Sequence, residues 1–448
     1  MVICFGRNAS SLPFPGMAGM SEDEVRVLAW ETGFQQRAPR KIDPAAFAAA
    51  LLDLSVRGPC SFNDLAARLD EASGCLVSRQ AVAARMGEPC VRFLEAILGR
   101  TLAHPGPGAP EGTASPPGRY RRILVQDSTV VQLPARLFSE FSGVSNGLAA
   151  ACNARIQVVH ELLGGSFVSF AVDPYSRNDQ AAAADLELRP GDLALRDRGY
   201  LSADEVRRHL DAGADCIYRH KLRMTYLDPA TGDPLDLPAL LRKHGSLDMD
   251  VCLNNPERTP VRLVAAPVGE ETANLRRMKL RKETRGHAPG KKLLELMSWT
   301  IFLTTIPRER ASFRQILEIY GLRWRIETIF KTWKSELHMD CIHNVSANQL
   351  RVLLIARMIA LAACVRTVFH HARERIRKRY GKELSLIKTA RFVASGRTTV
   401  TAIDRALRQG KRTSQTLDSL ARYCTYDSRK RRNFNQICEA LDDIWPLG

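Results

Sequence analysis

The hydrophobic and polar positions change their period along the chain, and each change marks a different kind of segment. From residue 23 to residue 103 apolar residues recur at helical spacing. After residue 119 short runs rich in β-branched residues predict strands over 122–133, 155–163 and 166–172, and further strands are predicted over 192–197 and 215–219. Helices are predicted between them over 179–188 and 204–212. Consecutive strands followed by alternating helices and strands are typical of an α+β fold, in which helices pack against a mixed sheet.

Pro, Gly and turn residues divide the chain further. Residues 1–22 contain Ser, Pro and Gly without an apolar period, and we expect them to be disordered. Residues 104–118, HPGPGAPEGTASPPG, predict a linker. Turn signals recur over 220–298 with strands such as 260–267 between them, which indicates a β-rich insertion. A strand at 298–305 returns to the sheet, and residues 371–448 are predicted to be helical.

A helix pair is predicted inside the N-terminal helical region. Residues 62–69 and 78–86 have helical patterns, and a turn passes through Gly74 between them. Ser78 is a suitable N-cap for the second helix. That helix would offer four polar side chains to a DNA groove: Ser78, Arg79, Gln80 and Arg85. A DNA-binding domain over 23–103 is one interpretation, and a plain helix pair without DNA contacts is the other.

The amphipathic stretch 316–337, ILEIYGLRWRIETIFKTWKSEL, is predicted to form one helix. Its apolar residues fall on one arc, which a helix buries against a core. Its polar residues share the adjoining face at 3.6 residues per turn, and they are Tyr320, Arg323, Glu327, Lys331 and Lys334. A carboxylate among cations can hold a metal while its neighbours hold a polyanion. The alternative is a surface helix stabilised by i,i+4 ion pairs such as Arg323–Glu327.

The balance of charges favours a polyanionic partner. The formal net charge is +17 and the pI is near 9.6, and Lys and Arg bind nucleic acid by neutralising phosphates. The basic segment 276–292 predicts either a solvated loop or a hairpin that reaches for phosphate. Residues 352–369 are strongly apolar but contain Arg357 and Arg366, so they predict a buried helix and not a membrane span. Eleven cysteines without a CxxC pair, and no secretory leader, favour a reducing cytoplasm.

Two aspartates lie in predicted strands, where a buried carboxylate must be paired or must coordinate a metal. Asp127 falls within an apolar run, and Asp197 ends the run DLALRD. For Asp127, the following Ser and Thr leave open the alternative of an ordinary turn or cap. Two-metal phosphodiester chemistry needs carboxylates that converge from different elements. Glu327, on a helix packed against the sheet, would complete such a set.

These residues also carry a resemblance to a known family. Tyr320, Arg323, Glu327 and Lys334 match the spacing Y-x2-R-x3-E-x6-K, and the chain resembles the bacterial DDE transposases of the insertion sequence 4 family, in which this is the YREK signature. The resemblance includes QDST around Asp127, LRDRGY around residue 197 and a W-x-x-x-L-T-T strand before the signature, and it covers about residues 55 to 370. It implies a ribonuclease-H-like core over 119–219 and 299–370, interrupted by the β-rich insertion 220–298.

The resemblance also implies roles for single residues. Asp127, Asp197 and Glu327 are expected to carry catalysis and to bind two Mg²⁺ ions, for which Mn²⁺ would substitute. DNA phosphate contacts are expected from Tyr320, Arg323, Lys331, Lys334 and Arg219. Trp299 and Trp324 are expected to hold or replace a flipped base during hairpin formation. For Trp299 the alternative is ordinary strand core.

The implied function is cut-and-paste DNA transposition. The protein would bind inverted terminal repeats as a homodimer on paired double-stranded ends, cleave them through a hairpin intermediate, and join the 3′-OH ends to target DNA. It would work in the bacterial cytoplasm, associated with the nucleoid and without a membrane, and residues 371–448 would supply dimer or DNA contacts. The alternatives are a metal-dependent nuclease without strand transfer, a resolvase-like recombinase, and a domesticated DNA-binding protein.

Overall fold

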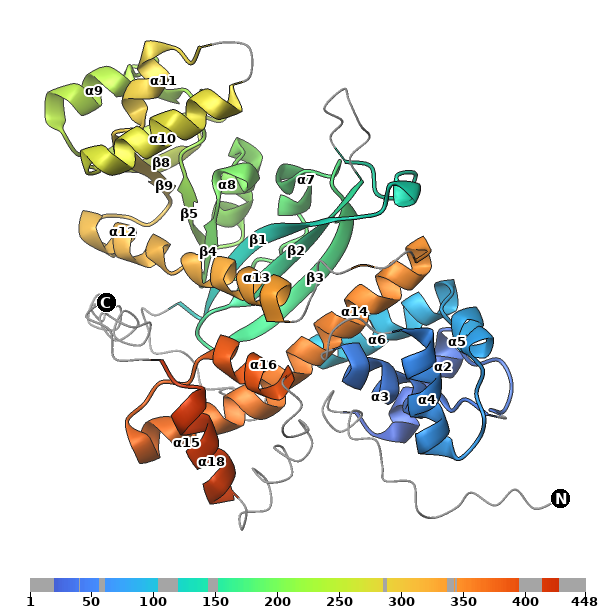
Figure 1. Ribbon diagram of the computed structural model, residues 1–448. Helices are drawn as coiled ribbons and strands as arrows, with labels where there is room; N and C mark the ends of the chain where they lie inside the picture. The colour runs from blue at the N-terminus through green and yellow to red at the C-terminus, as the bar shows by residue number, and fades with distance from the viewer. Residues whose placement is uncertain are drawn as a thin grey trace.

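A nine-stranded mixed sheet runs through the molecule (Figure 1). The computed structural model describes residues 20–39, 41–55, 61–103, 120–143, 152–284, 288–336, 342, 345–394 and 413–426. The strands are β1 (Arg122–Gln132), β2 (Asn153–Glu161), β3 (Ser166–Pro174), β4 (Asp192–Arg196), β5 (Asp215–Arg219), β6 (Tyr226–Leu227), β7 (Leu247–Leu253), β8 (Pro260–Pro267) and β9 (Trp299–Thr304). Their order in the sheet is β3-β2-β1-β4-β5-β9-β8-β7-β6.

The helices fall into three groups along the chain. The N-terminal group is α2 (Glu22–Glu31), α3 (Pro44–Ser55), α4 (Phe62–Ser73), α5 (Arg79–Arg85) and α6 (Glu88–Ala103). The sheet carries α7 (Asp179–Ala183), α8 (Ala203–Asp211), α9 (Leu237–His244), α10 (Glu270–Glu283), α11 (Lys291–Leu296), α12 (Phe313–Gly321), α13 (Trp324–Glu336) and α14 (Ala347–Cys364). A π-helical turn (Val365–Phe369) then leads to α15 (His370–Tyr380), α16 (Leu386–Ala394) and α18 (Thr413–Tyr423).

Strand directions confirm the predicted α+β fold with a mixed sheet. β1 pairs antiparallel with β2, and β2 with β3, whereas β1 pairs parallel with β4, and β4 with β5. Each of the five strands that the β-branched and apolar runs predicted in this half of the sheet is present, with ends that differ by at most two residues. The β-branched and apolar runs are therefore sufficient to identify the strands, because both faces of this sheet are covered by helices.

The two faces of the sheet have separate cores. Along β1, Val125 and Val131 point toward the cluster that contains Trp333 of α13, whereas Leu124 belongs to a smaller cluster with Leu186 on the other face. This division follows from the alternation of side chains along a strand. It means that Asp127, in phase with Val125 and Val131, faces α13, and that its neighbour Ser128 faces α7.

The predicted single helix over 316–337 is wrong at one point, because two helices, α12 and α13, occupy this stretch. The break falls at Leu322 and Arg323, directly after Gly321, a residue of poor helix propensity. The break lets Tyr320 of α12 pack on Phe302 of β9, with the ring centroids 4.3 Å apart. Tyr320 therefore does not share a helical face with the polar residues of α13. Residues 337–341 lie outside the described residues.

Residues 220–298 contain three strands and three helices, and β8 joins this segment to the rest of the sheet through β9. In Figure 1 the helices α9, α10 and α11 lie together at this end of the sheet. The expectation of a loop or hairpin over 276–292 is wrong, since this stretch begins inside α10 and ends in the first turn of α11. Residues 285–287, between the two helices, lie outside the described residues.

The long apolar helix α14 crosses the molecule between the N-terminal helices and the sheet (Figure 1). By length and composition it would be able to span a membrane, but 78% of it is buried inside the protein, as in the core helix of a folded domain. Its buried residues share one continuous core with Phe47 of α3 and Phe93 of α6. Residues 352–364 are thus part of a buried helix, as their sequence predicts.

Several predicted boundaries fall on residues that the structure does not describe. Of the expected disordered segment 1–22, residues 1–19 lie outside the described residues, and Ser21 caps α2. The predicted linker 104–118 lies outside them entirely, as do 395–412 and 427–448 of the C-terminal region. The division into domains therefore stays a prediction.

The packing of α13 leads to a test of stability with two tryptophans on one helix. Trp333 is 1% exposed and lies 5.4 to 5.8 Å, between ring centroids, from Phe167, Phe170 and Phe330. Trp333→Ala should lower the free energy of unfolding by about 3–5 kcal/mol, because it removes a large side chain from a packed core. The measurement is urea-induced unfolding followed by circular dichroism.

Trp324→Ala is the matched control for this test. Trp324 is 58% exposed at the start of the same helix, so its removal should change the free energy of unfolding by no more than about 0.5 kcal/mol. Equal destabilisation by the two substitutions would contradict the packing of α13 described above.

Candidate active site

The register of the sheet brings two aspartates to the same level on neighbouring strands. β1 and β4 are parallel, and Gln126 lies opposite Arg196 in the last registered pair. Asp127 follows Gln126 within β1, and Asp197 follows Arg196, the last residue of β4, so their backbones are separated by about the 4.8 Å spacing of paired strands. The sheet thus brings these two aspartates side by side, as their positions in neighbouring predicted strands suggest.

Arg323 connects the third acid to the first. Its Nη1 donates a hydrogen bond to Asp127 Oδ2 at 2.6 Å, and its Nη2 donates to Glu327 Oε1. The guanidinium therefore lies between a carboxylate of β1 and a carboxylate of α13, and it forms an ion pair with each. The i,i+4 pair between Arg323 and Glu327 that the sequence suggested is present, but it belongs to a larger cluster that includes the sheet.

The three acids line one cavity of about 340 Å³, together with cations from α13 and the break before it. The lining residues are Asp127, Ser128, Thr129, Asp197, Arg323, Glu327, Phe330, Lys331 and Lys334. The pKa of Asp127 is raised to about 6, chiefly by burial; the charge of Arg323 opposes this rise, and the charges of Asp197 and Glu327 make smaller contributions to it. The site thus concentrates negative charge in a partly dehydrated place, which is costly unless a cation compensates it.

Within the described part of the chain, no three His, Cys, Asp or Glu side chains are close enough to hold one metal ion together. Arg323 is the cation between Asp127 and Glu327 in this arrangement. The donor set nevertheless fits a divalent ion, because Asp197 Oδ1 is buried and has no hydrogen-bond partner among the described residues. Carboxylate oxygens are the preferred ligands of Mg²⁺. Asp127, Asp197 and Glu327 therefore have the chemistry of a divalent-metal site.

The remaining predicted residues of α12 and α13 divide between this cavity and the interior. Lys334 Nζ donates to the carbonyl oxygen of Val130 at 2.9 Å, and Lys331 Nζ lies 5.7 Å from the ring centroid of Trp324. Both lysines reach the cavity. Tyr320 instead lies in the interior, where its hydroxyl donates to the carbonyl oxygen of Arg196 and burial raises its pKa. Tyr320 thus supports the strand end that leads into the second aspartate.

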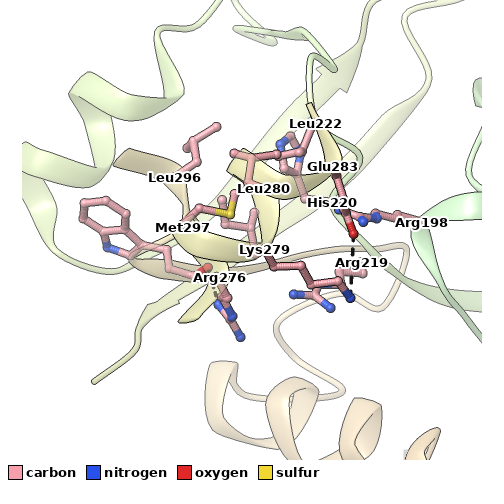
Figure 2. Close-up of a pocket in the computed structure, with 12 residues that line it drawn as sticks. Arg198, Arg219, His220, Leu222, Arg276, Lys279, Leu280, Glu283, Leu296 and Met297 are labelled. Atoms are coloured by element: carbon pink, nitrogen blue, oxygen red, sulfur yellow. Dashed lines mark hydrogen bonds and ion pairs between the residues drawn. The ribbon is translucent and has the colours of Figure 1, made fainter. Parts of the chain in front are cut away.

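A second cavity, of about 110 Å³, contains the other two predicted residues, Arg219 and Trp299. Figure 2 shows four cationic side chains around it, which are Arg198, Arg219, Arg276 and Lys279, with one acid, Glu283, and an apolar wall. The indole nitrogen of Trp299 donates to the carbonyl oxygen of Gly245 at 2.7 Å. Burial and the charge of Arg219 lower the pKa of Arg276. This cavity therefore has an excess of positive charge beside an aromatic ring.

Sequence reasoning missed three of these cations as individual site residues. Arg198 directly follows Asp197, so consecutive residues after β4 line the two cavities. The motif LRDRGY contains Arg198, directly after the aspartate. Arg276 and Lys279 belong to the basic stretch 276–292, whose sequence indicates its charge but not its helical structure.

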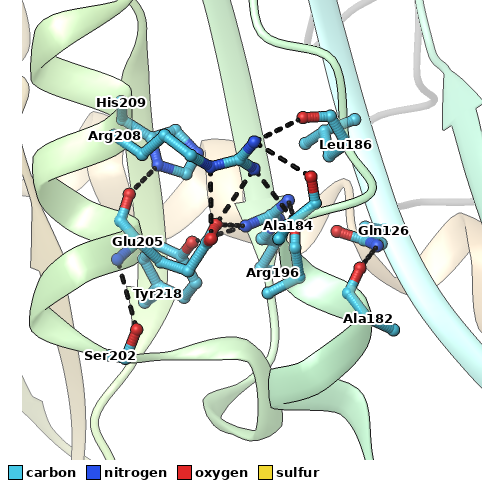
Figure 3. Close-up of polar contacts among 11 residues, drawn as sticks. Gln126, Ala182, Ala184, Leu186, Arg196, Ser202, Glu205, Arg208, His209 and Tyr218 are labelled. Atoms are coloured by element: carbon cyan, nitrogen blue, oxygen red, sulfur yellow. Dashed lines mark hydrogen bonds and ion pairs between the residues drawn. The ribbon is translucent and has the colours of Figure 1, made fainter.

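A buried ion-pair network fixes the strand end that carries Asp197 (Figure 3). The fully buried Arg196 donates to Glu205 Oε2 at 2.7 Å, to the hydroxyl of Tyr218 at 2.9 Å and to the carbonyl oxygen of Ala183 at 2.8 Å. Arg208 donates to the same glutamate and to the carbonyl oxygen of Ala183. Loss of either partner of such a pair leaves a buried charge uncompensated. The residue before Asp197 is thus held from α7, α8 and β5 together.

The predicted N-terminal helix pair is present as α4 and α5, with Gly74 in the left-handed conformation at the end of α4. Ser78 caps α5 as expected, since its side chain accepts a hydrogen bond from the amide of Ala81. Arg85 Nη1 donates to the carbonyl oxygen of Phe34. Of the four side chains predicted for a DNA groove, Arg79 and Gln80 are therefore the exposed ones without such an internal role in the described structure.

The chain is similar in sequence to several transposases of bacterial insertion sequences. The transposase for insertion sequence element IS231B of Bacillus thuringiensis subsp. berliner is 27% identical over 388 residues, which cover 81% of this chain and 80% of that protein. The transposase for insertion sequence element IS231C of the same subspecies is 28% identical over 393 residues, with the same two shares. The transposase for insertion sequence element IS1151 of Clostridium perfringens is 24% identical over 337 residues, covering 68% of this chain and 70% of that protein.

A solved structure of a piggyBac transposase synaptic complex with hairpin DNA aligns over 96% of this chain and 89% of that chain. The TM-score of 0.45 and the identity of 10% are too low to support a conclusion about this protein. The family model of the transposase DDE domain matches residues 119–363, which are more than half of the 448 residues and include all three acids of the cavity. The chain therefore belongs to the family of transposases with a DDE domain.

Proposed function

We propose that this protein is a cut-and-paste DNA transposase of the insertion sequence 4 type, with Asp127, Asp197 and Glu327 as its catalytic triad. The observation that carries the proposal is that these three acids, from β1, the end of β4 and α13, line one cavity with Arg323, Lys331 and Lys334. The spacing Y-x2-R-x3-E-x6-K in the sequence supports the assignment of Tyr320, Arg323, Glu327 and Lys334 to the YREK signature. The strand order β3-β2-β1-β4-β5, with β2 antiparallel to its neighbours, supports a ribonuclease-H-like core.

The triad would hold divalent cations, two Mg²⁺ ions or Mn²⁺ in their place. Bound there, these ions would supply positive charge to the attacking and leaving oxygens of phosphodiester hydrolysis and strand transfer. Asp127 would act as a ligand from the middle of β1 and Asp197 from the end of β4, and these fixed positions in the sheet give the site its rigidity. Glu327 would bind the same ions from α13 once its ion pair with Arg323 is broken.

Arg323, Lys331 and Lys334 would bind phosphates of the DNA end. A phosphate oxygen is a strong acceptor for a guanidinium, so DNA would compete with Asp127 and Glu327 for Arg323. Such an exchange would free the two carboxylates when the substrate arrives. In this proposal the arginine thus compensates the charge of the acids in the protein without DNA and the charge of a phosphate in the complex.

The second cavity fits the hairpin route. Arg219 and the cations beside it offer charge for a phosphate, and Trp299 offers an aromatic face for an unstacked base. Trp324, which is exposed at the start of α13, offers a second aromatic face near Lys331. A base removed from the duplex would gain stacking that offsets part of the cost of its extrusion.

The partner is expected to be double-stranded DNA, both the inverted repeats of the element and the target. The net charge of +17 supports this expectation, and Arg79 and Gln80 at the start of α5 would be the residues to contact a groove. We further propose that a homodimer acts on paired ends and that residues 371–448 contribute to dimer or DNA contacts. The setting would be the bacterial cytoplasm with association to the nucleoid.

Isosteric substitution of the triad tests the proposed function. Asp127→Asn, Asp197→Asn and Glu327→Gln should each reduce cleavage of the element's own terminal repeats at least about 100-fold, because several kcal/mol of transition-state stabilisation depend on ion binding. Binding of the repeats should persist. The measurements are a Mg²⁺-dependent cleavage assay on labelled DNA and a gel-shift assay.

Glu309→Gln, which changes an exposed acid that lines neither cavity, is the control. Efficient cleavage by any of the three triad variants would show that the substituted residue is not catalytic. Hydrolysed ends that are never joined to target DNA would instead identify a metal-dependent nuclease. Binding of the repeats without any metal-dependent cleavage by the unsubstituted protein would identify a DNA-binding protein.

Trp299 gives a separate test of the hairpin route. Trp299→Ala should reduce hairpin formation about 5- to 150-fold while the first nick changes little, since stacking contributes about 1–3 kcal/mol per base. Trp299→Phe keeps an aromatic face and should restore most of the hairpin product. Single-turnover reactions resolved on denaturing gels separate the two steps. An equal decline of both steps would show that Trp299 serves only as strand core.

A further inference from the structure

A fourth acid, Asp179, contacts the segments that carry both proposed catalytic aspartates. It is the first residue of α7, and its Oδ1 accepts hydrogen bonds from three side chains: Ser128 Oγ at 2.8 Å, Arg155 Nη1 at 2.5 Å and Gln157 Nε2 at 3.1 Å. These donors come from β1 and β2. We propose that Asp179 is a positioning residue that fixes Asp127 and Asp197 relative to each other, an inference that rests on the function proposed above.

The link to Asp127 runs through Ser128. The two residues are consecutive on β1 and point to opposite faces of the sheet. The hydroxyl of Ser128 donates to Asp179, and its amide donates to Asp127 Oδ1 at 2.8 Å. Ser128 is therefore held by its side chain from the α7 face while its backbone holds the Asp127 carboxylate on the α13 face.

The link to Asp197 runs through the turn that follows it, the short 3₁₀ helix Arg198–Tyr200. A Cβ atom added to Gly199 would lie 2.9 Å from Asp179 Oδ2 and 3.2 Å from Asp179 Cβ. Only glycine permits so close an approach of this backbone to the carboxylate. The turn is also tied to Asp179 by a second route, since the hydroxyl of Tyr200 donates to Gln157 Oε1 at 2.6 Å and Gln157 Nε2 donates to Asp179.

Asp179 is itself held by a buried cation. Arg155 is 8% exposed, and its guanidinium carbon lies 4.4 Å from the ring centroid of Tyr175. The ion pair with Arg155 thus anchors Asp179 to β2, a strand that carries neither catalytic aspartate. Partners behind metal-binding carboxylates orient those ligands, and their loss typically weakens metal binding 10- to 100-fold. We infer that Asp179 is such an orienting partner for both Asp127 and Asp197.

Metal binding by the full-length protein tests the proposal without relying on catalysis. Titration with Mn²⁺ or Mg²⁺ alone, followed by the rise in unfolding temperature, gives the metal concentration at half-maximal shift. For Asp179→Ala this concentration should rise at least about 10-fold, while binding of the terminal repeats stays unchanged. Asp179→Asn keeps the acceptor atom for Ser128, so it should recover part of the loss.

Gly199→Ala approaches the same contact from the other side and keeps the Arg155 ion pair. It should raise the half-maximal metal concentration as well, because its Cβ displaces the Asp179 carboxylate. In the Asp179→Ala background the nearest atom at 2.9 Å is gone, so adding Gly199→Ala should cost much less than it does alone. This double-mutant cycle keeps the proposal testable even if one single variant is poorly folded.

Asp185→Ala is the matched control, since Asp185 forms an ion pair with Arg177 in the same region and is half exposed. Its half-maximal metal concentration should equal that of the unsubstituted protein. A lower unfolding temperature for Asp179→Ala with an unchanged half-maximal concentration would overturn the positioning role. If the unsubstituted protein shows neither a metal-dependent shift nor cleavage, the proposed function fails, and this inference fails with it.

Discussion

The geometry of the site depends on the burial of one face of α13 against the sheet. Trp333, Phe330 and Ile326 are buried there in the main core, and each such side chain contributes roughly 1.5–3 kcal/mol when it is removed from water. The helix cannot roll without losing this contact. Glu327, on the adjoining face, is therefore directed at the middle of β1 and the end of β4, where the parallel register has already brought Asp127 and Asp197 to one level. Apolar packing and strand pairing thus bring together three carboxylates that would repel one another and move apart if only electrostatics acted.

Those charges have to be compensated, and in this structure Arg323 does so for two of the three acids. The raised pKa of Asp127 is the sign that the compensation is incomplete, since burial favours its protonated form. Asp197 Oδ1, buried without a hydrogen-bond partner among the described residues, is a second sign. Both observations agree with a site whose charge balance is completed by cations from outside the chain, and this is the physical reason why the DDE family assignment and the geometry support each other.

Much of this arrangement is predictable from the sequence, and the exceptions have identifiable causes. The strand of Asp127 is predictable because a β-branched run identifies it, and the strand before Asp197 because a short apolar run does. The face of Glu327 is predictable because helical periodicity is strong there. The break before α13 is not, because it depends on Gly321 together with the packing of Tyr320 on Phe302, a contact with β9. The helices α10 and α11 at the two ends of the basic stretch 276–292 are not predictable either, because the Gly and Pro residues of this stretch indicate a loop or turn. Asp179 carries no periodic signal, since its partners are brought to it by the fold.

Titration with Mn²⁺ followed by electron paramagnetic resonance tests whether Asp127, Asp197 and Glu327 bind divalent cations. A proton on Asp127 competes with an ion, and the folded-state pKa of this carboxyl is about 6, above the ordinary value. The affinity of the protein for Mn²⁺ should therefore be highest near pH 8 and should fall as the pH drops through 6. Asp127→Asn should bind Mn²⁺ weakly at both pH 8 and pH 5. Mn²⁺ binding that is equal at pH 8 and pH 5, or undiminished in Asp127→Asn, would contradict the account.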